Sequence, residues 1–146
     1  SLLPVSQVNG GAEKAYQQVL LDARKKNQLN RDNAQLARVR RVAERLIPAT
    51  TAFRNDAPGW RWEVNVITSS EVNAWCMPGG KVVVYTGLLP VTLDEPSLAV
   101  VMGHEIAHAV ARHGNERMSE QMAAQGLGTG LAIATMNKPA RAAPEP

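Results

Sequence analysis

One stretch of the chain, residues 95–113, constrains its fold and chemistry more than any other. It is apolar almost all the way round, which is typical of a helix buried in a core rather than one lying on a surface. Asp94 offers an amino-terminal cap, Glu95 and Pro96 suit a first turn, and Gly114 suits a carboxyl-terminal stop. The pattern therefore predicts one buried helix of about 18 residues.

Three polar side chains interrupt this helix: His104, Glu105 and His108. At about 100° per residue the two histidines lie about 40° apart and one turn removed, so both imidazoles can bind one ion. Neutral imidazole is a good zinc ligand, and Glu105 lies beside the ion, where a general base can take a proton from zinc-bound water. Burying all three groups without a metal would cost several kcal/mol. A zinc site with His104 and His108 as ligands and Glu105 as base is therefore favoured over three ordinary core residues.

The rest of the chain alternates between helical and extended patterns. Apolar residues at helical spacing predict two earlier helices, the second capped by Asp32, and a further helix is expected after Gly114. Alternating or β-branched segments predict strands, and Pro78-Gly79-Gly80 is a turn signal that joins two antiparallel segments. The expected helices cover residues 11–27, 33–47 and 116–125, the strands 62–67 and 81–86, an extended or irregular segment 73–77, and a proline-rich tail 138–146.

Composition narrows the classes of protein further. The net charge of +3 comes mainly from arginines and lysines on the predicted helices, where they are interpreted as a solvated face. Nucleic-acid binding would need a denser basic stripe with aromatic residues among it, and aromatic residues make up only 4% of the chain. No apolar run is long enough to span a membrane, and no signal peptide is visible at the start.

Cys76 and His113 are two further residues with reactive side chains, and both are interpreted as structural. Cys76 has no second cysteine with which to pair, and it is interpreted as a small apolar residue beside the cleft. His113 lies about 180° from His104 around the helix, so it cannot share the same ion. It is interpreted as a residue that caps the helix end.

Two separate blocks, in the right order, resemble the HtpX-type metallopeptidases. The first covers residues 73–89, NAWCMPGGKVVVYTGLL, and the second covers residues 101–114, VMGHEIAHAVARHG. The opening around residues 11–16 is similar to mature periplasmic members of the LoiP and BepA kind. The resemblance thus extends over most of the chain.

This resemblance implies a gluzincin: an α+β, zincin-like metallopeptidase domain, mostly helical with a small antiparallel sheet, over residues 1–137. It implies that the strand over residues 81–86 forms the upper edge of the cleft, where Val82, Val83 and Val84 pair with the substrate main chain. Asn73 and Ala74 would lie close to the bound peptide. For Asn73, a simple turn residue is the alternative interpretation.

In this family a third zinc ligand, a glutamate, comes from a helix well past the histidine motif. The acidic residues after His108 are only Glu116, Glu120 and Glu145. The first two are interpreted as a solvated helix face and the last as part of the tail. The chain is therefore expected to be the amino-terminal part of a catalytic domain, without the family's later helices.

The resulting hypothesis is a zinc-dependent endopeptidase that hydrolyses unfolded or misassembled envelope proteins. The resemblance implies a periplasmic location, associated with the outer membrane through an upstream lipid anchor, and no nucleic-acid partner. The alternative is a non-catalytic or weakly active, chaperone-like module that binds peptides, because the third ligand is absent. A purely structural metal site is a third hypothesis, and it predicts a closed ligand shell.

Overall fold

The computed structural model describes residues 5–112, with side chains from Gly10 onward. The α-helices are α1 (Val5–Lys25), α2 (Asn33–Leu46) and α3 (Glu95–Ala111). The strands are β1 (Glu63–Ile67), β2 (Ala74–Met77) and β3 (Lys81–Tyr85). Three short 3₁₀ helices connect them: η1 (Ile47–Ala52), η2 (Ala57–Gly59) and η3 (Thr86–Val91). The predicted helix 116–125, the Gly114 stop, His113 and the tail 138–146 lie outside the described residues.

Helix starts follow the capping residues that the sequence predicts. The Asp94 carboxylate accepts a hydrogen bond from the Ser97 backbone N–H at 2.8 Å, and Pro96 occupies the first turn of α3. Asp32 caps α2 in the same way, accepting from the Gln35 backbone N–H at 3.0 Å. Each cap satisfies one backbone donor that a helix start otherwise leaves unpaired.

The sheet has the strand order β1-β3-β2. β2 and β3 are antiparallel, as predicted, and the turn between them places Gly79 and Gly80 at φ of 88° and 94°, a region that favours glycine. β1 pairs with β3 in parallel, so the prediction of a wholly antiparallel sheet is wrong. The reason is that residues 68–73 lead from β1 to the far edge of the sheet, where β2 forms. The hairpin after β2 then places β3 between β1 and β2.

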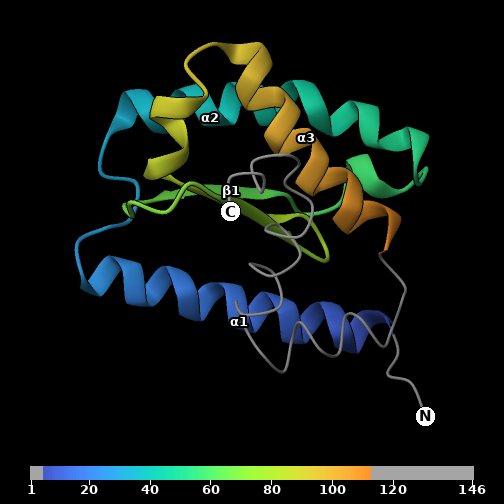
Figure 1. Ribbon diagram of the computed structural model, residues 1–146. Coiled ribbons are helices and arrows are strands. Elements are labelled where there is room, and N and C mark those ends of the chain that lie inside the picture. Colours follow the sequence, from blue (N-terminus) through green and yellow to red (C-terminus); the bar gives the residue numbers. More distant parts are fainter. Residues whose placement is uncertain (1–4, 113–146) are drawn as a thin grey trace, which may run out of the picture.

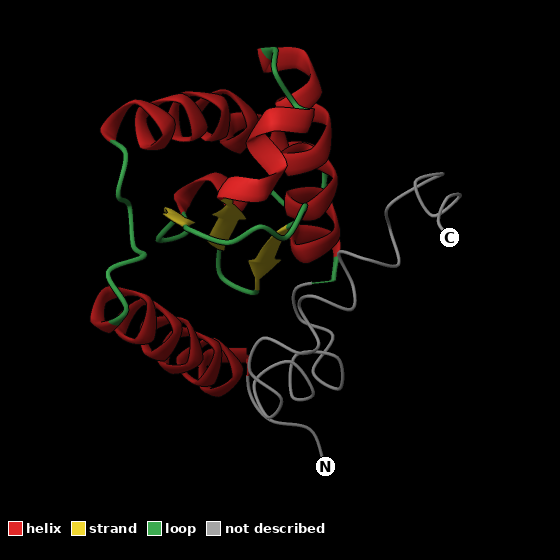
Figure 2. Ribbon diagram, turned by 60° about the vertical axis from the view of Figure 1, so that its left-hand side comes forward, coloured by secondary structure: helices red, strands yellow, loops and turns green. Residues whose placement is uncertain are grey.

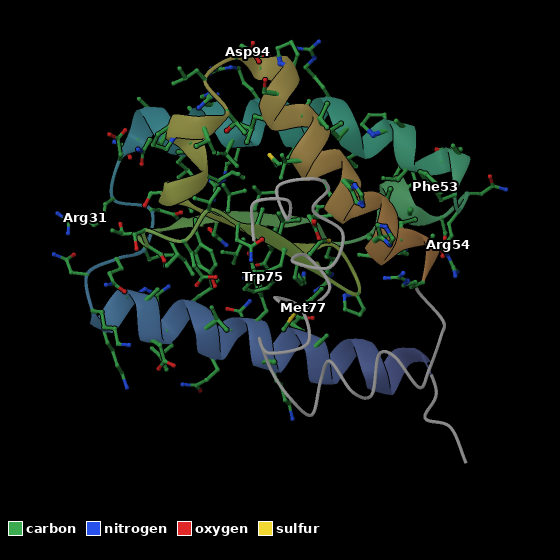
Figure 3. All side chains as sticks on the ribbon, viewed as in Figure 1. Arg31, Phe53, Arg54, Trp75, Met77 and Asp94 are labelled. Atoms are coloured by element: carbon green, nitrogen blue, oxygen red, sulfur yellow. The ribbon has the colours of Figure 1, made fainter. Side chains whose placement is uncertain are left out.

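Helices cover both faces of this sheet, with α1 on one side and α2 and α3 on the other (Figures 1 and 2). Side chains of β3 alternate between the two faces: Val83 and Tyr85 pack in the cluster with α1, whereas Val82 and Val84 pack in the cluster with α2 and α3. Figure 3 shows Trp75 and Met77 of β2 between the sheet and α1. The two cores are therefore separate, and the molecule is an α+β structure with a mixed sheet.

Helix α3 is buried on one side only, so the expectation of burial all round is wrong. Leu98, Met102, Ile106 and Val110 are fully buried against the sheet and α2, but Val100 is 70% exposed. The apolar residues on the outer side of α3 therefore do not contribute to the core that the structure describes. Among the described residues, no helix combines the length and the hydropathy that crossing a membrane requires.

Candidate active site

The outer side of α3 carries the two histidines of the motif. The rings of His104 and His108 lie parallel, with centroids 4.8 Å apart and an angle of 13° between their planes. This arrangement follows from helical spacing, since residues four apart are neighbours on one helix face. The prediction that both imidazoles lie on the same side of the helix is confirmed. Their role as metal ligands stays a prediction.

The local electrostatics favour the neutral form of His108. Partial burial lowers the pKa of His108, and the positive charge of Arg112 and the neighbouring His104 lower it further. A neutral imidazole offers a nitrogen lone pair to a divalent cation, whereas a protonated one does not. Imidazoles on one side of a helix, with the neutral form of His108 favoured, are donors of the kind that zinc prefers.

Glu105 lies on a different side of α3 from the histidines. It is buried, with 6% of its surface exposed, whereas His104 next to it is exposed. Its carboxylate lies close enough to β2 to raise the pKa of the Cys76 thiol. Glu105 is thus a buried carboxylate near β2 and next to the exposed His104 in sequence, and its role as a base beside an ion stays a prediction.

Cys76 belongs to the side of β2 that faces α3. Burial raises the pKa of its thiol, and the nearby Glu105 carboxylate raises it further, so the thiol stays protonated at neutral pH. Cys76 packs in the same apolar cluster as Met102 and Ile106. These contacts agree with the interpretation of Cys76 as a small apolar residue close to the site.

Asn73 and Ala74 lie at the start of β2. The Asn73 side-chain oxygen accepts a hydrogen bond from the Ala74 N–H at 2.9 Å, and its backbone carbonyl accepts one from the Tyr85 N–H at 3.1 Å. Both residues are buried, and Ala74 packs in the cluster that includes α3. These bonds give Asn73 the structural role of shaping the entry into β2, and contact with a peptide stays a prediction for both residues.

The predicted edge strand is the point at which the structure corrects the sequence interpretation. β3 is the central strand, with its main chain paired to β1 on one side and to β2 on the other. Val82, Val83 and Val84 are each at most 1% exposed, so β3 is not an edge at which a peptide could pair. An unbroken run of β-branched residues is typical of a strand covered on both faces, and this signal indicated the central position.

The edge nearest the motif helix is β2 instead. β2 has more contacts with α3 than either other strand does, and it pairs only with β3. Within residues 5–112 no strand covers its other side. The residues of the first resemblance block therefore lie at a sheet edge, but the edge is residues 74–77 and not residues 81–86.

The described residues include both histidines that are predicted as ligands, but they form no larger cluster of metal-binding side chains. No group of three or more His, Cys, Asp and Glu side chains lies together in a metal-binding arrangement within residues 10–112. Glu116, Glu120 and Glu145, which the sequence analysis weighed as third ligands, lie outside the described residues.

Comparison with known sequences now identifies the family. The sequence pattern of peptidase family M48 matches residues 33–143, a range that includes α2, the sheet and the whole motif helix. The chain belongs to peptidase family M48. The resemblance to metallopeptidases of this kind is thereby confirmed.

Several curated relatives are metallopeptidases by name. The mitochondrial metalloendopeptidase OMA1 of Arabidopsis thaliana is 47% identical over 44% of this chain. Metalloprotease YcaL of Escherichia coli K12 is 31% identical over 57% of the chain, and the beta-barrel assembly-enhancing protease of Yersinia pestis is 38% identical over 38%. The matched regions span only 13%, 32% and 12% of the lengths of these relatives, respectively.

Proposed function

We propose that this M48 chain is the part of a zincin-like catalytic domain that supplies two zinc ligands, the general base and the substrate-binding strand edge of a zinc endopeptidase. The observation that carries the proposal is the pair of parallel imidazoles, with ring centroids 4.8 Å apart, on the helix that also carries the buried Glu105. Metallopeptidase relatives and the family match support the same reaction class.

His104 and His108 would hold the zinc ion through their ring nitrogens. Zinc, when bound, acts as a Lewis acid that makes water more acidic and polarises the scissile carbonyl. Glu105 accepts the proton of the attacking water and returns it to the leaving amine. The burial of Glu105 keeps its carboxylate in one place, so it does not have to be ordered during the reaction.

The free edge of β2 would bind the substrate as an added strand. Main-chain hydrogen bonds to a strand edge are available only to an extended peptide, because a folded segment has already used its own donors and acceptors. Asn73 and Ala74 begin this edge and would contact one end of the peptide. The geometry thus favours unfolded polypeptides as substrates.

We further propose that the natural substrates are unfolded or misassembled envelope proteins and that the protein works in the periplasm, associated with the outer membrane. The likeness to a protein named beta-barrel assembly-enhancing protease supports this proposal. Other relatives carry mitochondrial names, so the location does not follow from family membership. Fractionation of cells that express the tagged, full-length protein tests it, and a cytoplasmic or purely soluble distribution would contradict it.

The second candidate is a peptide-binding module with little or no hydrolysis. It is favoured by one observation: residues 10–112 hold two histidine ligands and no third ligand beside them. In this case the chain would bind unfolded polypeptide through β2, and Glu105 would have no proton to transfer.

Hydrolysis of casein separates the two candidates. We expect the zinc-loaded chain to cleave casein, the Glu105→Gln variant to be slower by about 10²–10⁴-fold, and chelation of the metal to abolish cleavage. Glu44→Gln, an exposed glutamate on α2, is the matched control and should retain full activity. Equal activity of all samples would dismiss the peptidase proposal, and casein binding without any cleavage would establish the binding module.

Metal analysis tests the ligand assignment independently of activity. We expect about one zinc ion per chain at neutral pH and loss of this zinc in His104→Ala and His108→Ala. Glu105→Gln should keep its zinc, because the carboxylate lies beside the ion and is not a ligand. Retention of zinc by both histidine variants would contradict the assignment.

A further inference from the structure

The loop that leads into β2, residues 69–73, is attached to the start of η3 by three hydrogen bonds at its first residue. The Thr86 hydroxyl accepts a hydrogen bond from the Ser69 N–H at 3.0 Å and donates one to the Ser69 carbonyl at 3.0 Å. The Gly87 N–H donates to the same carbonyl at 2.8 Å. We call residues 69–73 the entry loop, and its first residue is thus bound as firmly as a residue within a strand ladder.

Gly87 lies so close to the entry loop that only glycine fits there. A Cβ at this position would come within 3.0 Å of the backbone carbonyl groups of Ser70 and Glu71, closer than real Cβ atoms approach. Main-chain atoms cannot swing aside as the end of a flexible side chain does. The next two residues, Leu88 and Leu89, are buried in the core cluster that includes α3, whereas Ser70 and Glu71 are exposed. A side chain at position 87 would therefore displace the entry loop more easily than the core.

The entry loop continues the β2 edge beyond the neighbourhood of Glu105. Its last residue, Asn73, accepts a hydrogen bond at its carbonyl from the Tyr85 N–H at 3.1 Å, as a strand residue would. Asn73 precedes Cys76, whose thiol lies near Glu105, by three residues of extended chain, or about 10 Å. Residues 70–72 before it are exposed. A peptide paired with β2 beside Glu105 would therefore reach the entry loop a few residues from its reacting bond.

We propose that Thr86 and Gly87 are positioning residues for the substrate: they hold the entry loop in line with the β2 edge, so that the loop binds the part of an extended peptide beyond its reacting bond. This inference rests on the proposed peptidase function. It gives a role to the end of the first resemblance block, which that function leaves unused. Both residues act through the loop, so they should matter for a long peptide and not for one confined to β2.

Peptides of different lengths test the inference on the zinc-loaded chain. A short fluorescent peptide, about as long as β2, is compared with two longer versions that are extended at one end or at the other. Binding is measured by anisotropy on the Glu105→Gln background, which prevents cleavage during the measurement. We expect one longer peptide to bind more tightly than the short one. Gly87→Ala should weaken binding of that longer peptide by roughly tenfold, the scale of one or two main-chain hydrogen bonds, and leave the short peptide unchanged.

The chain offers matched controls for both residues. Gly59→Ala makes the same change in η2, where a Cβ would meet no atom within 4 Å, and it should alter neither affinity. Thr86→Val removes the hydroxyl at nearly constant volume and should weaken binding of the longer peptide. Thr86→Ser keeps the hydroxyl and should restore this binding. The two threonine variants keep the test decisive if Gly87→Ala does not fold.

Two results would overturn the inference. One is that neither longer peptide binds the natural sequence more tightly than the short one does. The other is that Gly87→Ala and Thr86→Val weaken all peptides equally or not at all, which would give both residues a purely structural role. If casein is still cleaved in a Glu105-dependent manner, each of these results rejects the positioning role alone. A selective loss of the longer peptide without any zinc-dependent cleavage would instead support the positioning role and reject hydrolysis.

Discussion

The two faces of the sheet use polar groups in opposite ways. On the face covered by α1, polar side chains bond to one another and to the main chain in a network that runs from the buried Tyr16 to the exposed Arg40. On the face covered by α3, the helix positions Glu105 at the border of the core and leaves His104 exposed. The comparison teaches that one face is tied together by a polar network, whereas the other carries the residues that we propose for catalysis.

The α1 face is organised around Tyr16, which is fully buried. Its hydroxyl donates to the Val82 carbonyl at 2.6 Å and accepts from the Asn65 amide at 3.0 Å. The Asn65 side-chain oxygen accepts from Asn30 at 2.9 Å and from Arg40 at 3.2 Å. Burial raises the pKa of Tyr16, so the hydroxyl keeps its proton and its donor role. This network ties α1, the loop before α2, α2 itself and the sheet together.

The largest expected effect comes from the aromatic core of the α1 face. Trp75 is fully buried, packs edge-to-face on Tyr16 and donates its indole N–H to Tyr85 at 3.1 Å. Trp75→Ala should lower the free energy of unfolding by about 3–5 kcal/mol, because it leaves a cavity under β2. Urea unfolding measures it, with Leu21→Ala on the exposed side of α1 as the control. A cost below about 1 kcal/mol would show that α1 does not hold β2 in place.

Removal of the Tyr16 hydroxyl should have an intermediate effect on the free energy of unfolding. Tyr16→Phe keeps the ring but deprives Asn65 and the Val82 carbonyl of a partner, and it should cost about 1–3 kcal/mol. Because Tyr16 lies on the face away from α3, zinc content and specific activity per folded molecule should stay the same. A selective loss of activity would break the division between a stabilising face and a catalytic face.

The Cys76 thiol gives the α3 face its own dependence on pH. In the folded chain its pKa is raised, so above about pH 8.5 the unfolded chain loses a proton that the folded chain keeps. Stability from this group is therefore complete below that pH and falls as the pH rises, by at most about 1.4 kcal/mol per unit. Urea unfolding between pH 7 and 10 should show a steeper decline for the natural sequence than for Cys76→Ala. Equal slopes would contradict the burial of Cys76 beside Glu105.

The smallest effect is expected where α2 meets α3 at the surface. Arg45 lies 2.8 Å from Glu95, but its side chain is 77% exposed. Water screens such a pair, and Arg45→Ala should change the free energy of unfolding by less than about 1 kcal/mol. Thermal unfolding at low and high salt measures this contribution. A larger loss would mean that this ion pair, and not only apolar packing, fixes the start of α3.

The local pattern was enough to predict most elements and the motif geometry. Helix caps at Asp32 and Asp94, the hairpin turn and the shared side of His104 and His108 all depend on neighbours close in sequence, and the structure confirms each of them. The placement of Glu105 next to the histidines in sequence likewise depends on helical spacing, and its position beside an ion stays a prediction. Such features follow from helical spacing and turn chemistry alone.

The errors concern arrangements between distant segments. The parallel pairing of β1 with β3 is set by the route of residues 68–73, and the sequence carries no local signal of that route. The assignment of Val82 to Val84 to an edge failed for the same reason, although their continuous β-branched pattern indicated a strand with both faces covered. The exposure of Val100 was missed because an apolar helix is usually covered on every side.

The strand order has a consequence for how the molecule is assembled. Within residues 5–112, β1 and β2 are not neighbours in the sheet, and each forms its ladder with β3, which follows both of them in sequence. Both ladders of this sheet therefore need β3, so neither can be complete before Tyr85 has been synthesised. After the short η3, α3 comes next in the sequence. The support beneath Glu105 would thus be completed just before the helix that carries it is made.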